Sequence, residues 1–203
     1  MSAALEALRR RFDGHQPGLL GARNEYAVLC PLLEQPDGVH LLFEVRAAQL
    51  RQGGEVCFPG GRLESQETPA ECALRETEEE LSIPRSQIQL LGAPDFICNQ
   101  RGFLLRPYLG LISPEGYAAI SPSSAEVAEV FTVPLAFFRA TPPALYSYEL
   151  IPSVPKDFPY ETVGIPRSYP WDHGRVEVPV WTYNGHAVWG MTARLVRDIV
   201  STL

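Results

Sequence analysis

Three glutamates near one another, Glu76, Glu79 and Glu80, are the residues best placed to do chemistry. At about 100° per residue in an α-helix, Glu79 lies roughly 60° to one side of Glu76 and Glu80 roughly 40° to the other. Glu78 points nearly the opposite way. Three carboxylates on one narrow face repel one another unless a cation lies among them, and the macrodipole at a helix C-terminus adds to the repulsion. Because oxygen ligands favour hard cations, the cluster predicts a site for Mg²⁺ or Mn²⁺.

The segment around these glutamates shows where a helix begins and ends. Thr68 is a good N-cap, Glu71 three residues later completes a capping box, and Pro69 stands at the first helical position, where its missing N–H costs nothing. Pro84 prevents the helix from running much further. A Glu-rich helix end on its own is usually a solvated face, so a metal site needs support from neighbouring residues.

That support is a longer pattern between Gly61 and Ile83. Its fixed positions are Gly61, Glu67, Arg75, Glu76, Glu79 and Glu80. Their spacing closely resembles the signature motif of the Nudix hydrolases, here in residues 61–83. The resemblance implies an α/β/α sandwich and a metal-dependent hydrolase that cleaves a diphosphate linkage.

The resemblance also implies roles for single residues. Glu76, Glu79 and Glu80 would hold one or more Mg²⁺ or Mn²⁺ ions, which neutralise the diphosphate and lower the pKa of a water that attacks phosphorus. Arg75, on a different side of the helix, would orient neighbouring carboxylates or the preceding turn. Glu67 would belong to the scaffold of the metal site.

Two positions depart from the family pattern. Thr77 stands where an aliphatic residue is usual, and Ser82 replaces a glycine just past the helix end. A glycine there supplies the left-handed residue that closes the helix, so Ser82 is expected to cost on the order of 1 kcal/mol. The departures concern the geometry of the helix more than catalysis.

A second pattern lies just before this motif. Its positions are Arg46-Ala47, Arg51, Gly54 and Phe58-Pro59-Gly60-Gly61. They resemble the upstream signature of the coenzyme A pyrophosphatase branch of the Nudix family, with one residue fewer than usual between Arg51 and Gly54. Glycines around a Phe-Pro step let the backbone approach a ligand closely. The expected substrate-binding residues are Arg46, Arg51, Phe58, Gly60 and Gly61.

The substrate expected from this branch is a small-molecule nucleoside diphosphate. Coenzyme A or its thioesters would be cleaved to 3′,5′-ADP and 4′-phosphopantetheine or its acyl derivative. The shorter gap keeps open another nucleoside diphosphate derivative, such as ADP-ribose or a dinucleotide. A noncatalytic binding module of the same fold is a third alternative, which the intact glutamate triad disfavours.

One further acidic residue could reach the metal from a loop. Nudix enzymes often place an additional glutamate after the motif, and Glu126 and Glu129 are both candidates here, with Glu126 preferred as a catalytic residue. Either could equally be a solvated loop or strand-edge residue, because sequence does not give the position of a loop.

Composition limits the kinds of protein this chain can be. With 203 residues, 45% of them hydrophobic and 20% charged, it is expected to form one globular domain spanning residues 1–203, without a membrane span and located in the cytoplasm. A formal net charge of -7 argues against a nucleic-acid binder. The cysteines are expected to be reduced, buried thiols; they are Cys30, Cys57, Cys72 and Cys98.

The remaining segments predict an α+β fold with helices packed on a mixed sheet. Apolar and β-branched runs predict strands at 25–33, 39–47, 88–98, 102–112 and 176–183. Asn184-Gly185 predicts a hairpin turn, beside which His186 is expected to be a surface residue. Helices are expected at about 2–12 and, at the C-terminus, over 191–200.

The segment from about 141 to 179 is rich in proline and aromatic residues. It is expected to be either an ordered cover or a subunit contact, as in a homodimer. Clustered aromatics could stack a purine, but they more often pack together under a long loop. A flexible linker is disfavoured because disordered linkers contain few aromatics.

Overall fold

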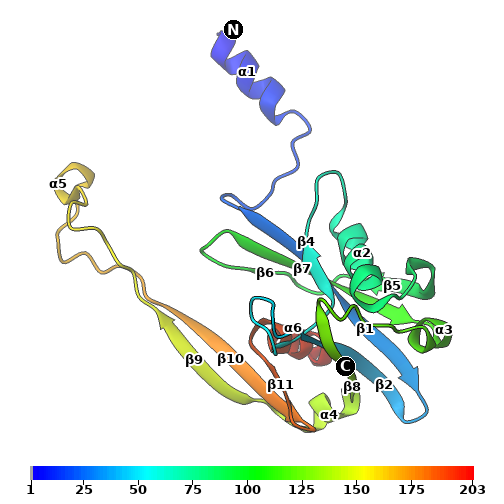
Figure 1. Cartoon of the computed structure of the whole chain (residues 1–203). Helices are drawn as coiled ribbons and strands as arrows, with labels where there is room; N and C mark the ends of the chain where they lie inside the picture. Colours follow the sequence, from blue (N-terminus) through cyan, green and yellow to red (C-terminus); the bar gives the residue numbers. More distant parts are fainter. Residues whose placement is uncertain (1) are drawn as a thin grey trace.

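A computed structural model describes residues 2–203, and its helices and strands alternate along the chain (Figure 1). The helices are α1 (Ala3–Phe12), α2 (Pro69–Leu81), α3 (Pro114–Ala118), α4 (Leu135–Ala140), α5 (Tyr160–Val163) and α6 (Gly190–Ser201), with a 3-10 turn at Arg85–Gln87. The strands are β1 (Asn24–Gln35), β2 (Gly38–Arg46), β3 (Val56–Cys57), β4 (Gly60–Arg62), β5 (Ile88–Gly92), β6 (Ile97–Cys98), β7 (Phe103–Ile112), β8 (Val127–Pro134), β9 (Ala144–Leu150), β10 (Gly174–Tyr183) and β11 (His186–Trp189). No helix in residues 2–203 is long and apolar enough to cross a membrane.

The main sheet is mixed, as expected. Its strand order is β3-β2-β1-β7-β5, and β4, β6 and β8 extend it by pairing with β1, β7 and β2. β1 and β2, which contain the strands predicted at 25–33 and 39–47, form an antiparallel hairpin, whereas β1 and β7 run parallel. A second sheet has the order β11-β10-β9.

Helices cover both faces of the main sheet. One apolar core lies under α2 and includes Ala27 and Leu29 of β1, and the other lies under α6 and includes Cys30 of β1 and Phe43 of β2. Because successive strand residues point to opposite faces, each central strand supplies both cores. The result is the predicted α/β/α sandwich (Figure 1).

The signals for the start of α2 are confirmed. The Thr68 Oγ1 accepts a hydrogen bond from the Glu71 N–H at 3.3 Å, and the Glu71 Oε2 accepts one from the Thr68 N–H at 2.7 Å. At the other end Ser82 is left-handed, with φ of 59°, and its N–H donates to the Glu78 carbonyl. Its hydroxyl donates to the Ser121 carbonyl at 2.8 Å, which offsets part of the cost of this conformation.

The strand predicted over 88–98 is wrong as a single element. The structure divides it into β5 and β6, which pair with different parts of β7. Pro94 lies in the interruption and has no N–H to donate to a ladder, which explains the break. The predicted turn at Asn184-Gly185 is confirmed, with φ of 47° and 88°.

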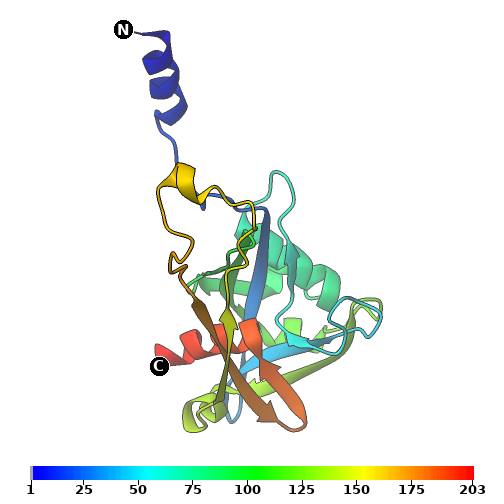
Figure 2. The same ribbon diagram turned by 90° about the vertical axis from the view of Figure 1, so that its left-hand side faces the viewer.

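The segment 141–179 does not cover a core. β9 and β10 form a long arm that extends from the body, with α5 at its tip, and Figure 2 shows this arm in front of the main sheet. Within the tip, the Phe158 ring packs against those of Tyr160 and Trp171. The predicted N-terminal helix is present as α1, which lies apart from the sheet and buries none of its residues.

Candidate active site

The most buried of the three glutamates of α2, Glu80, contacts the start of β4, the strand that precedes this helix. Glu80 is 4% exposed, and its Oε2 accepts a hydrogen bond from the Gly60 N–H at 2.8 Å. Gly60 has φ of 154° and pairs with Val28, and a Cβ on it would overlap the Ala27 carbonyl oxygen. Glycine therefore allows the backbone to lie between β1 and Glu80.

The three glutamates of α2 differ in their contact with solvent. Glu79 is exposed, with 57% of its side chain accessible, whereas the side chain of Glu76 is 15% accessible and Glu80 is buried. The carboxylate of Glu76 lies directly against Gly61, where a Cβ would overlap it. The predicted shared face therefore runs from solvent at Glu79 to the core at Glu80.

Arg75 is the cation among these carboxylates. Its Nη1 lies 2.9 Å from Glu76 Oε1 and 3.1 Å from Glu79 Oε2. Its Nε and Nη2 donate to the two oxygens of Glu67 at 3.1 and 3.0 Å. Arg75 leaves the helix on a different side, but its long side chain bridges two of the glutamates as well as Glu67, which are the contacts expected of a residue that orients neighbouring carboxylates.

A fourth carboxylate, missed in the sequence, belongs to Glu44 on β2. This residue is 1% exposed; its Oε1 accepts a hydrogen bond from the Cys57 thiol at 3.3 Å, while its Oε2 has no hydrogen-bond partner. Its charge interacts with those of Glu76, Glu80 and Glu126. The available signal was a charged residue inside the apolar run 41–45, at a position that faces α2.

Burial controls the acidity of the cluster. It raises the pKa of Glu80 to about 9 and that of Glu44 to about 7, and it also raises the pKa of Glu76. Nearby carboxylates act in the same direction. Hydrogen bonds from Arg75 instead lower the pKa of Glu67 to about 2. The inner carboxyls therefore need a further positive charge to ionise readily at neutral pH.

The clustered carboxylates suit a hard divalent cation, although their present arrangement does not form a complete coordination site. No three His, Cys, Asp or Glu side chains in residues 2–203 converge closely enough to hold a metal ion as they stand. Binding would require Glu76 and Glu79 to turn away from Arg75. The donors are all carboxylate oxygens, and the unpartnered Glu44 Oε2 leaves one of them free, which suits Mg²⁺ or Mn²⁺.

Of the two candidate loop glutamates, the structure brings only Glu126 to the cluster. Glu126 precedes β8, its carbonyl accepts the Ala47 N–H at 2.8 Å, and its charge acts on those of Glu44 and Glu80. Glu129 instead lies 3.3 Å from His186 Nε2. The His186 ring is stacked on Phe131 and its side chain is 23% accessible, so it is less exposed than expected.

The expected substrate-binding residues separate into two groups. Arg46 ends β2 and Arg51 lies in the turn that follows it, where Arg46 Nε donates to the Arg51 carbonyl at 3.4 Å. The charge of Arg46 acts on the carboxylate of Glu44. The expectation for Phe58 is wrong, because its side chain is 3% exposed and stacks on Phe43 in the core under α6, on the opposite side of the sheet from the carboxylates. A further correction concerns Cys98, which is exposed; all four cysteines are free thiols.

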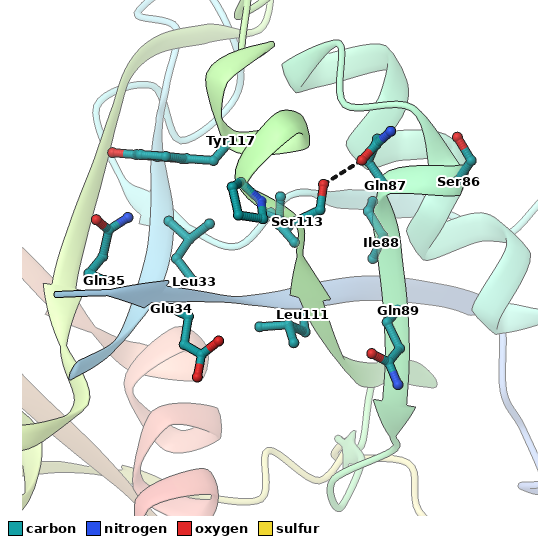
Figure 3. A pocket seen from close by; sticks show the side chains of 12 residues that line it. Leu33, Glu34, Gln35, Ser86, Gln87, Ile88, Gln89, Leu111, Ser113 and Tyr117 are labelled. Carbon is teal, nitrogen blue, oxygen red and sulfur yellow. Dashed lines mark hydrogen bonds between the residues drawn. The ribbon is translucent and has the colours of Figure 1, made fainter.

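A separate cavity of about 470 Å³ lies at the other end of β1, near α3 (Figure 3). Its walls include Leu33, Gln35 and Tyr117. Two of its polar side chains, Ser113 and Gln87, hydrogen-bond to each other, as the dashed line in Figure 3 shows. The carboxylates of the cluster do not line it, so the cavity does not compete with them as the site of chemistry.

The raised pKa values predict how stability depends on pH. Without metal, the folded protein binds more protons at Glu44 and Glu80 than the unfolded chain above the usual carboxyl pKa, so unfolding releases protons and stability falls as pH rises. Thermal unfolding in EDTA should therefore show Tm falling by several degrees from about pH 5.5 to about pH 8, since 1 kcal/mol shifts Tm by roughly 2–4 °C at this size. Glu80→Gln should reduce this slope. An unchanged or rising Tm over that range would contradict the burial of these carboxyls.

Comparisons with known proteins agree with this geometry. A family model described as NUDIX domain matches residues 23–152. A Yersinia enterocolitica protein described as an uncharacterized Nudix hydrolase, NudL, is 32% identical over 191 residues, covering 91% of this chain and 84% of the relative. The NudL of Citrobacter koseri is 30% identical over 207 residues, covering 98% of this chain and 94% of the relative.

A solved structure shares the fold. The crystal structure of a Nudix hydrolase from M. Smegmatis, RenU, covers 58% of this chain and 74% of its own, with a TM-score of 0.50 and 23% identity. The motif in residues 61–83, the sandwich around it and these relatives lead to one conclusion. The chain belongs to the Nudix family and is a Nudix hydrolase.

Proposed function

We propose that this Nudix hydrolase cleaves the diphosphate of coenzyme A or its thioesters, releasing 3′,5′-ADP and 4′-phosphopantetheine or its acyl derivative. The observation that carries the proposal is the pattern from Arg46 to Gly61. It resembles the coenzyme A branch of the family. Arg46 ends β2 and Arg51 lies in the turn that follows, and the charge of Arg46 acts on the carboxylate of Glu44. The closing run Val188-Trp189-Gly190-Met191-Thr192-Ala193 resembles that branch as well.

In this proposal each residue has a defined task. Glu76, Glu79 and Glu80 hold the divalent cation, which supplies charge for the diphosphate and acidity for the attacking water. Arg75 keeps Glu76 and Glu79 in place, and when they turn toward the cation it remains anchored by Glu67. Glu126 adds negative charge from the loop before β8.

The substrate assignment predicts a preference for the 3′-phosphate. Coenzyme A differs from dephospho-coenzyme A in this group alone, and in this proposal Arg46 and Arg51 supply the positive charge for it. We expect kcat/KM to fall about tenfold or more from coenzyme A to dephospho-coenzyme A, and Arg51→Ala to remove most of that difference. The measurement is steady-state kinetics with both substrates, with Arg139→Ala, on α4, as the control. Equal rates for both substrates, or a preference for ADP-ribose, would overturn the coenzyme A assignment and leave the hydrolase intact.

A second candidate is another nucleoside diphosphate derivative, such as ADP-ribose or a dinucleotide. The observation that favours it is the turn between Arg51 and Gly54, which is one residue shorter than the coenzyme A pattern and uses left-handed backbone at Gln52 and Gly54, with φ of 60° and 83°. A panel of diphosphates assayed with Mg²⁺ and with Mn²⁺ separates the two candidates. The cytoplasm is the proposed location, because free thiols, one of them exposed, suit a reducing compartment.

We also propose a homodimer through the β9–β10 arm. β9 is exposed at six of its seven residues, and in residues 2–203 it pairs with β10 alone, so its outer edge is free to pair. A two-fold antiparallel pairing centred on Ser147 would place Tyr146 of one copy opposite Tyr148 of the other, a favourable aromatic cross-strand pair. These tyrosines are 64% and 53% exposed.

Sedimentation measures this directly. The wild type should sediment with the mass of two chains at micromolar concentration. Tyr146→Lys combined with Tyr148→Lys should sediment as one chain, because like charges then face each other across the pairing. A wild type with the mass of one chain would overturn the dimer.

A further inference from the structure

Glu44 is a buried carboxylate, and one of its two oxygens accepts no hydrogen bond. It is 1% exposed, the Cys57 thiol donates to its Oε1 at 3.3 Å, and its Oε2 has no hydrogen-bond partner. An unpaired carboxylate oxygen away from water costs free energy that an apolar residue would not. Its neighbours Leu42 and Phe43 show that β2 accommodates apolar side chains on both faces at this depth.

The direction of the side chain connects Glu44 with the site. Leu42 packs in the core under α2, and Glu44, two residues later on the same strand, faces the same way. That side of the sheet carries Glu80, whose charge acts on that of Glu44. The opposite direction, toward α6, is taken by Phe43 and Val45. The free oxygen is therefore on the side of the sheet where the proposed function places a cation.

We propose that Glu44 is a further ligand for the divalent cation, contributed by β2 from outside the 61–83 motif, with Oε2 as the coordinating atom. The inference rests on the proposed metal dependence. A cation at this position would partner the free oxygen and lie between Glu44 and Glu80, at the buried end of the glutamate face. Cys57 would be a positioning residue, because its thiol fixes one oxygen and directs the other toward the cation.

The test is the affinity of the metal-free protein for Mn²⁺, measured by calorimetric titration after EDTA treatment. Glu44→Gln keeps the size of the side chain and can still accept from Cys57, but it replaces a ligand oxygen. We expect it to raise the Kd for Mn²⁺ at least tenfold. Its Tm in EDTA should equal or exceed that of the wild type, since a buried carboxyl is removed. Glu78→Gln is the matched control: Glu78 lies on the far side of α2 in an ion pair with Arg85, and its Kd should match the wild type.

Two more variants separate the possible failures. Glu80→Gln reports whether the glutamates of α2 bind Mn²⁺ at all. Glu44→Asp keeps the charge but withdraws it by one methylene, and it should also raise the Kd. It replaces Glu44→Gln in the test if that variant does not fold. If Mn²⁺ binds and Glu80→Gln weakens it while both Glu44 variants keep the wild-type Kd, Glu44 is no ligand and the proposed function stands. If the wild type shows no saturable Mn²⁺ binding, the proposed function and this inference fall together.

Discussion

Replacing Glu76, Glu79 or Glu80 with glutamine is expected to lower kcat by about 10³-fold or more, roughly 4 kcal/mol in the barrier. Each change removes a charged oxygen from the proposed cation site, and a cation held less firmly gives less stabilisation to the diphosphate as it is attacked. Steady-state kinetics at saturating Mg²⁺ and Mn²⁺ measure the loss. Glu78→Gln is the control and should stay within about twofold, because this residue pairs with Arg85 on another side of the helix.

The same substitutions are also expected to change the stability of the metal-free protein, and the contacts of each glutamate give the direction. Glu76 and Glu79 are each bound to Arg75, so removing either charge also removes an ion pair. Glu80 has no such partner in residues 2–203, and glutamine there can still accept the Gly60 N–H. Glu80→Gln should therefore leave the metal-free protein as stable as the wild type or more so. Equal losses of activity at Glu78 and Glu79, or a clear loss of stability in Glu80→Gln, would mean that these residues are structural.

Gly61→Ala is expected to reduce kcat by about 10²-fold or more while changing Tm little. An added Cβ would overlap the carboxylate of Glu76, which is the free end of a flexible side chain and can swing away without disturbing the backbone. The fold survives such a movement, but the carboxylate leaves the glutamate face. The measurements are kcat and Tm on the same preparation.

Substitutions at two other glycines serve as controls for this prediction. Gly92→Ala should change neither quantity, because open space surrounds that position. Gly60→Ala should lower Tm strongly, because its Cβ would meet backbone atoms of Ala27 and Val28, which cannot swing away as the end of a flexible side chain can. A Gly61→Ala variant with wild-type kcat would remove Glu76 from the site.

The features predicted most reliably from the sequence are helix caps and turns, which depend on residues close together in the chain. The capping box of Thr68 and Glu71 defined the start of α2, and Asn184-Gly185 defined a hairpin turn, since both depend on residues a few positions apart. Even the departure at Ser82 was located correctly: the serine adopts the left-handed conformation of the usual glycine. The glutamate face followed from helical periodicity alone.

Long-range packing explains what the sequence did not predict. Glu44 lies more than thirty positions from Glu80, and only the pairing of β2 within the sheet brings it beneath α2. Phe58 was expected at the substrate because of the glycines beside it, but its side chain enters the opposite core. The arm at 141–179 was ambiguous because prolines and aromatics suit both an ordered cover and a subunit contact.

Product analysis with coenzyme A tests the central claim most directly. The wild-type protein, incubated with coenzyme A and Mn²⁺, should release 3′,5′-ADP and 4′-phosphopantetheine in equal amounts, resolved by chromatography and mass spectrometry. Excess EDTA should stop the release, and Glu80→Gln should lack it. Folded wild-type protein that leaves coenzyme A intact with both Mg²⁺ and Mn²⁺ would contradict the coenzyme A assignment. Failure to cleave any diphosphate under these conditions would contradict the proposed metal-dependent mechanism as well.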